Sequence, residues 1–222
     1  TMTDGPRGLF DHQLTELRDG IVLLGSMVDS AVEQAIQSLK DQDKDLARKV
    51  VSEDERINAK RYDIEEQCLT LIATQQPAAS DLRAIIAAIH IVGELERMGD
   101  HATGIAELAI RLSDQPPLKP LIDIPRMAQI AQEMIHASLE AYLEHDPDSA
   151  LTTAQRDAEI DRLYDQLYRE LLTYMLEDPR NITRATYLLW VSHNLERIAD
   201  RAVNICERVI FMTTGEIKEL SF

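Results

Sequence analysis

Acidic side chains spaced four residues apart recur along this chain in positions where they could bind a metal ion. Glu96 and Asp100 form one such pair, and Glu196 and Asp200 form another. Residues i and i+4 of a helix project from one face, with Cβ atoms about 5–6 Å apart. Carboxylates this close repel each other, so they need a compensating positive charge. Arginine could supply that charge, and so could a hard cation.

Further oxygen ligands lie in the segment that precedes each pair. Neighbouring helices pack about 8–10 Å apart, so inward carboxylates from two helices can share one site. Oxygen donors suit magnesium, calcium, manganese or iron better than a metal that prefers thiolates. The candidate ligands are Asp54, Asn58, Glu96 and Asp100 in the first half, and Asp157, Asp161, Glu196, Asp200 and Asn204 in the second half.

These acid pairs recur at equivalent positions of an internal repeat, which is not expected by chance. At an offset of 100, eight of the sixteen residues from 95 to 110 are identical to those from 195 to 210. At an offset of 103, Asp54 aligns with Asp157 and Asn58 aligns with Asp161. Arginine pairing remains an open alternative to metal at both copies, because Arg97 and Arg197 are adjacent to the acids.

Apolar residues at three- and four-residue steps predict helices and no strands. The proline-rich segment 113–125 holds four of the eight prolines and cannot be helix interior. We therefore predict an all-α protein made of two three-helix halves, with a first repeat over 1–113, a connector over 114–125 and a second repeat over 126–222. Ser80 is the expected N-cap of the third helix. The predicted helices span 9–41, 43–75, 80–113, 124–145, 148–177 and 182–214.

Composition excludes several classes of protein. The formal net charge of −16 disfavours binding to nucleic acid and to anionic lipid. No segment is apolar enough to span a bilayer, and residues 1–18 carry acids where a signal peptide would be apolar. The two cysteines are far apart, as in a reducing compartment, so a cytoplasmic protein is expected.

Two segments carry a family resemblance. Leu95-Glu-Arg-Met-Gly-Asp-His-Ala-Thr-Gly-Ile-Ala-Glu107 and Leu195-Glu-Arg-Ile-Ala-Asp-Arg-Ala-Val-Asn-Ile-Cys-Glu207 resemble the repeated signature of PhoU proteins. The segments 10–14 and 76–83 and the helix spacing are similar to that family as well. The resemblance implies antiparallel bundles with approximate twofold symmetry and a homodimer. It implies a negative regulator of phosphate uptake, with a Pst-type phosphate ABC transporter and a sensor histidine kinase as partners, and membrane contact only through them.

The resemblance also implies metal binding through Glu96 with Asp100, Glu196 with Asp200, and Asp157 with Asp161. Iron, manganese, magnesium and zinc are all open as the metal. Asn58 stands where the second half has Asp161, and Gly104 stands where it has Asn204. We therefore expect the second-half site to bind the metal more tightly.

Two other functions remain as alternatives: a carboxylate-bridged metalloenzyme and a metal-free helical adaptor. An enzyme is not expected, because Glu133-Met-Ile-His136 has no second copy of its Glu-x-x-His spacing. The sequence shows no phosphate-binding loop and no evident cationic pocket for inorganic phosphate.

Overall fold

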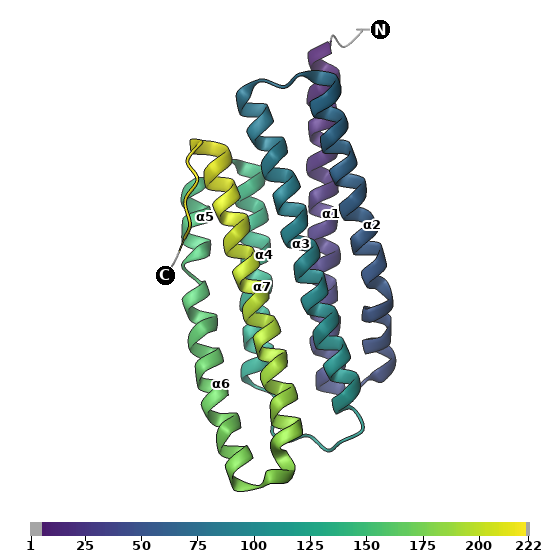
Figure 1. Cartoon of the computed structure of the whole chain (residues 1–222), viewed down its shortest axis with the longest axis vertical. Helices are drawn as coiled ribbons and strands as arrows, with labels where there is room; N and C mark the ends of the chain where they lie inside the picture. Colours follow the sequence, from purple (N-terminus) through teal and green to yellow (C-terminus); the bar gives the residue numbers. More distant parts are fainter. Residues whose placement is uncertain (1–5, 221–222) are drawn as a thin grey trace.

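Within residues 6–220, six long helices form an elongated all-α bundle (Figure 1). The structure, a computed structural model, describes residues 6–220. Residues 1–5 and 221–222, the outer ends of the two predicted repeats, lie outside the described residues. No strand occurs between residues 6 and 220, which confirms the predicted fold class. The elements are α1 (Pro6–Asp41), α2 (Lys44–Gln75), α3 (Ala79–Leu112), α4 (Asp123–Glu144), α5 (Pro147–Ala154), α6 (Asp157–Glu177), a short 3₁₀ helix (Pro179–Asn181) and α7 (Ile182–Thr214).

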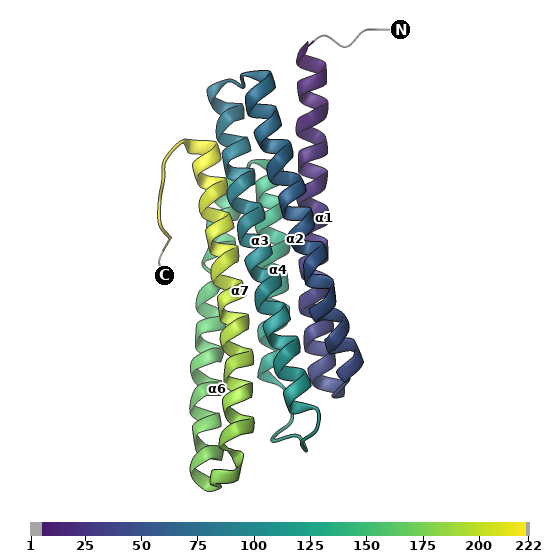
Figure 2. The ribbon, with the colours of Figure 1, turned by 45° about the vertical axis from the view of Figure 1, so that its right-hand side comes forward.

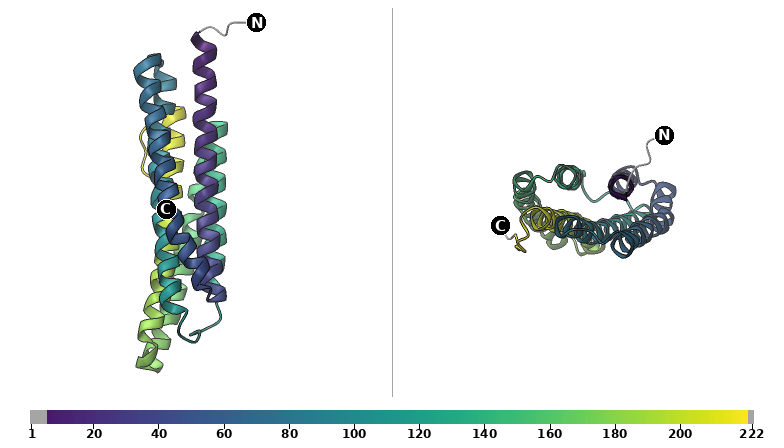
Figure 3. Two further views of the ribbon diagram at one scale, coloured as in Figure 1. Left: turned by 90° about the vertical axis from the view of Figure 1, so that its right-hand side faces the viewer. Right: turned by 90° about the horizontal axis from the view of Figure 1, so that it is seen from above.

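The two halves pack side by side around α3 and α7. Helices α1, α2 and α3 contact one another, α7 contacts α4, α5 and α6, and the halves meet through α3 with α7 and α1 with α4. Helices α6 and α2 lie on opposite sides of the bundle (Figure 1), and the turned views in Figure 2 and Figure 3 show the long helices packed side by side. Buried apolar side chains form one continuous core through both halves. The two repeats are therefore two parts of one packed unit.

Polar contacts across the α3–α7 interface follow the internal repeat. On one side, Glu94 of α3 accepts a hydrogen bond from Asn204 Nδ2 at 3.0 Å and pairs with Arg201 at 3.4 Å. On the other side, Asn194, which is the repeat equivalent of Glu94, lies 2.9 Å from His101 Nδ1. Residues 94 and 194 thus take equivalent places about an approximate twofold axis between the halves.

Three local expectations differ from the structure. Helix α3 begins at Ala79 with Ala78 as its N-cap, so Ser80 lies inside the helix and does not cap it. Helix α4 begins at Asp123, inside the predicted connector. The predicted helix 148–177 is broken after Ala154, where the backbone makes turns with hydrogen bonds from residue i+3 to residue i. Arg156 stabilises this break through ion pairs with Glu133 of α4, at 2.7 Å, and with Glu159.

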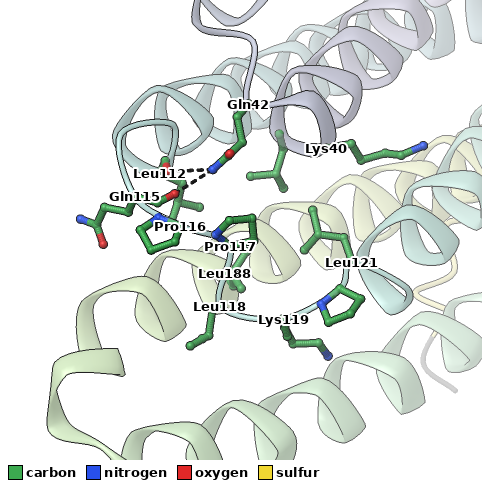
Figure 4. A pocket seen from close by; sticks show the side chains of 12 residues that line it. Lys40, Gln42, Leu112, Gln115, Pro116, Pro117, Leu118, Lys119, Leu121 and Leu188 are labelled. Carbon is green, nitrogen blue, oxygen red and sulfur yellow. Dashed lines mark hydrogen bonds between the residues drawn. The ribbon is translucent and has the colours of Figure 1, made fainter.

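The proline-rich connector is fixed to the end of the first half. Gln42, which has a left-handed backbone conformation, donates a side-chain hydrogen bond to the carbonyl of Gln115 at 2.8 Å (Figure 4). The side chain of Lys119 is only 6% exposed and pairs with Glu170 of α6. The connector covers a largely apolar cavity of about 290 Å³ between the halves. None of the described helices is long and apolar enough to cross a membrane.

Candidate metal sites in the two halves

The first-half cluster joins Asp54 of α2 to Glu96 and Asp100 of α3. Burial and the neighbouring Asp100 charge raise the pKa of Glu96, and burial and the Asp54 charge raise that of Asp100. Asp54 has two hydrogen-bond donors: Asn58 Nδ2 at 3.1 Å and Thr103 Oγ1 at 3.2 Å. The predicted first-half ligands therefore do come together, and Asn58 is already engaged with Asp54.

A cation from the chain itself occupies this first cluster. Arg61 Nη1 lies 3.2 Å from Glu96 Oε1, while Arg61 Nε donates to Glu65 at 2.8 Å. The Arg61 charge opposes the upward shift in the pKa of Glu96. The guanidinium supplies the compensating charge that the acid pair needs. The first half therefore agrees with arginine pairing, the alternative to metal binding.

The second-half cluster joins Asp157 and Asp161 of α6 to Glu196 and Asp200 of α7. Burial, followed by the charges of Asp161 and Asp200, raises the pKa of Asp157 to about 6. Burial and the Asp200 charge raise the pKa of Glu196 to about 7, against a smaller opposing effect of Arg197. These four carboxylates therefore lie close enough to influence one another's ionisation.

Two oxygens of the second cluster are buried without a hydrogen-bond donor in the described part of the chain: Asp157 Oδ1 and Glu196 Oε2. The nearest basic group to Glu196 Oε2 is His193 Nδ1, at 3.5 Å. Arg197 pairs with Asp200 at 2.7 Å, and both side chains are partly exposed. Buried carboxylate oxygens without donors are costly unless a cation or a proton satisfies them, so this donor set fits a hard metal ion.

Tyr164 explains why the two clusters differ. At the offset of 103 that aligns Asp54 with Asp157, Arg61 aligns with Tyr164. Tyr164 has no positive charge, and the Glu196 charge contributes to raising its pKa. The second cluster thus has no counterpart of the inward arginine. The sequence prediction considered only arginines adjacent to the acids, so it missed Arg61, Thr103 and Tyr164, although the repeat alignment pairs Arg61 with Tyr164.

The remaining candidate, Asn204, lies elsewhere. Its side chain donates to Glu94 across the interface between the halves. Gly104, its repeat equivalent, is closely approached by Asn194: a Cβ at Gly104 would lie 3.3 Å from Asn194 Oδ1. Between residues 6 and 220, no three His, Cys, Asp or Glu side chains converge tightly enough to hold an ion as they stand.

The fold and these clusters define a class: all-α proteins built from two copies of a three-helix unit, each with a cluster of acids on its last two helices. The chain belongs to the PhoU family, whose domain matches residues 21–109 and 124–209. It is 42% identical to the phosphate-specific transport system accessory protein PhoU homolog of Aquifex aeolicus, over 92% of this chain and 93% of that protein. The homolog of the same name from Pseudomonas putida is 40% identical, over 93% of this chain and 81% of its own length.

Solved structures agree with this assignment. The crystal structure of PhoU from Pseudomonas aeruginosa superposes with a TM-score of 0.89 at 38% identity, covering 93% of this chain and 100% of that one. The phosphate transport system regulatory protein PhoU from Streptococcus pneumoniae has a TM-score of 0.88 at 33% identity, covering 95% of this chain and 100% of that one. The recognised family and the predicted fold class are both confirmed.

Proposed function

We propose that this protein is a regulatory accessory protein of phosphate transport whose second acidic cluster binds a metal ion. The transport role is supported by relatives that span nearly its whole length and are named as accessory proteins of the phosphate-specific transport system. The metal is supported by one observation above all. Four carboxylates from α6 and α7 lie close together, and two of their oxygens are buried without a hydrogen-bond donor among residues 6–220.

Asp157, Asp161, Glu196 and Asp200 would hold the ion. A divalent or trivalent metal, with iron, manganese, magnesium and zinc as the candidates, would neutralise their charge when bound. The bound metal would cross-link α6 to α7 and so stabilise the surface that these helices form. We assign it a structural or sensing role rather than a catalytic one.

Partner proteins would bind to this surface. We propose that the chain acts in the cytoplasm as a negative adaptor between a phosphate ABC transporter and a sensor histidine kinase, as a homodimer. Large apolar side chains on α6 and α7 are exposed to solvent, among them Leu176, Tyr168 and Trp190, and exposed apolar groups of this size favour contact with another protein. Reconstitution of the protein with each membrane complex in turn, with and without metal, would test the two partners separately.

Elemental analysis of the gently purified protein tests the metal proposal. The matched variants are Glu196→Ala/Asp200→Ala in the second cluster and Glu96→Ala/Asp100→Ala in the first. We expect metal in the unaltered protein, loss of it in the second-cluster variant and retention of it in the first-cluster variant. Absence of metal from all three proteins, after metals have been added back, would overturn the proposal in favour of a metal-free adaptor.

A further inference from the structure

A second polar site lies where the two halves meet, and none of its lining residues belongs to the acidic clusters. A cavity of about 320 Å³ is bounded by α1, α3, α4 and α7. This volume is in the range of small-molecule pockets. Leu14, Leu17 and Met212 form its apolar walls, and Arg18 and Arg83 supply its positive charge.

Both guanidinium groups lack a carboxylate partner among the described residues. Arg18 donates to His145 Nε2 at 2.8 Å, which requires that nitrogen to be unprotonated. Arg83 Nε is buried without a hydrogen-bond acceptor in the part of the chain that the structure describes. The turn after α7 closes over Arg83, since a Cβ at Gly215 would lie 4.0 Å from Arg83 Cζ. A guanidinium without a carboxylate partner favours a bound anion, and both arginines line the cavity.

Tyr142 provides an independent indication. It lines the same cavity, only 4% of the residue is exposed, and no hydrogen bond joins its hydroxyl to a described residue, so the hydroxyl is open to the cavity. Burial raises the pKa of this phenol to about 12, and the Arg18 charge opposes that shift. A buried phenol normally finds a hydrogen-bond partner. Here a ligand in the cavity would be that partner.

We infer that this cavity binds a small phosphate-type oxyanion. Its donors come from three helices, Arg18 of α1, Arg83 of α3 and Tyr142 of α4, so they suit an anion whose oxygens point in several directions. One carboxylate, Asp81, also lines the cavity, but two arginines outweigh it and His145 is neutral. The volume and the apolar walls favour a phosphate monoester with a small organic group over inorganic phosphate. The sequence alone did not indicate this cavity, because the residues that line it are far apart in the chain.

Calorimetric titration of the full chain tests this inference, in chelator and at constant ionic strength so that metal at the acidic clusters cannot contribute. The probes are glycerol 3-phosphate, inorganic phosphate, sulfate and acetate. We expect saturable binding that is tightest for glycerol 3-phosphate and absent for acetate. Tighter binding of inorganic phosphate would identify the free ion as the ligand.

Four variants locate the binding. Arg83→Gln should weaken it about tenfold or more, because one charge-assisted hydrogen bond is lost, and Tyr142→Phe should weaken it severalfold without changing the cavity shape. Asp81→Asn should tighten it, an effect that a purely structural role would not produce. Arg169→Gln, which removes one positive charge from the exposed face of α6, is the control and should leave binding unchanged. No saturable binding, or equal loss in Arg83→Gln and Arg169→Gln, would overturn the inference.

Discussion

Arg61 Nη1 lies 3.2 Å from Glu96 Oε1 in the first acidic cluster, and the repeat equivalent of Arg61 in the second cluster is Tyr164. The same helical framework therefore supports two acidic groups with different means of charge compensation. An arginine neutralises one of them, and we propose that a metal ion neutralises the other.

Exchanging these two residues should exchange the behaviour of the clusters. Tyr164→Arg should abolish metal binding in the second half, because the guanidinium would pair with Glu196 and compete with the ion. Arg61→Tyr should create metal binding in the first half. Metal content per chain measures both effects, and Tyr164→Phe, which adds no charge, should retain the metal. If neither exchange alters metal content, Arg61 does not determine which half binds.

Stability without metal should fall as the pH rises through the range in which the second cluster ionises. Asp157 and Glu196, with pKa values of about 6 and 7, hold their protons more tightly in the folded state than in the unfolded chain. Their contribution is therefore fully present below about pH 4 and is lost as the pH rises past about 7. We expect a loss of about 1–3 kcal/mol from these groups, reduced by partial exposure to water.

Urea denaturation in chelator at about pH 5 and about pH 8 measures this loss. Asp157→Asn/Glu196→Gln should have a flatter pH dependence than the unaltered protein, because the amides do not titrate. Added metal should restore stability at the higher pH. An equal pH dependence in both proteins would place the titrating groups elsewhere.

The contact between Glu94 and its partners in α7 should contribute strongly to the packing of the two halves. Glu94→Ala removes the acceptor from Asn204 and the ion-pair partner from Arg201, whose guanidinium is mostly buried. We expect a loss of about 2–3 kcal/mol in the free energy of unfolding. The exposed Glu55→Ala is the matched control and should change it by less than about 0.5 kcal/mol. Similar losses in the two variants would mean that the contact across α3 and α7 contributes little.

Two glycines should respond in opposite ways to substitution by alanine. A Cβ at Gly25 of α1 would overlap Leu139 Cδ1 of α4, where the two halves meet, whereas a Cβ at Gly93 would meet nothing within 4 Å. Gly93→Ala should stabilise the protein by about 0.5–1 kcal/mol, because alanine costs less backbone entropy in a helix. Gly25→Ala should be about 1–2 kcal/mol less stable than Gly93→Ala, since Leu139 must move. Equal urea midpoints for the two variants would contradict the close approach of α1 and α4.

Periodicity and repetition predicted the helices and the acid pairs because both depend on residues close in sequence. Glu196 and Asp200 share a face by helical geometry alone, and the repeat offset placed Asp157 and Asp161 on the adjacent helix. The break at Gln155 and Arg156 was not predictable in this way. It contains no glycine or proline, and its stabilising partner Glu133 lies on another helix.

Contacts between distant segments account for the other differences. The sequence favoured the second cluster because Asn58 and Gly104 weaken the first, whereas the structure adds a different reason in Arg61. Asn204 was a candidate metal ligand because it follows the acidic motif in sequence. Its side chain instead donates to Glu94, which lies in the other half. The cavity of the second polar site depends on Arg18 and Arg83, which no local pattern connects. The predicted repeat boundaries at 113 and 125 stay a prediction.

The matching positions of Glu94 and Asn194 have an evolutionary consequence. Surfaces related by a twofold axis are self-complementary, so a protein with only one repeat could bury its third helix against a second copy of itself. Gene duplication and fusion of such a homodimer would produce the present arrangement in a single polypeptide. Once fused, the two copies were free to diverge. An arginine in one and a tyrosine in the other could then specialise them without loss of their shared core.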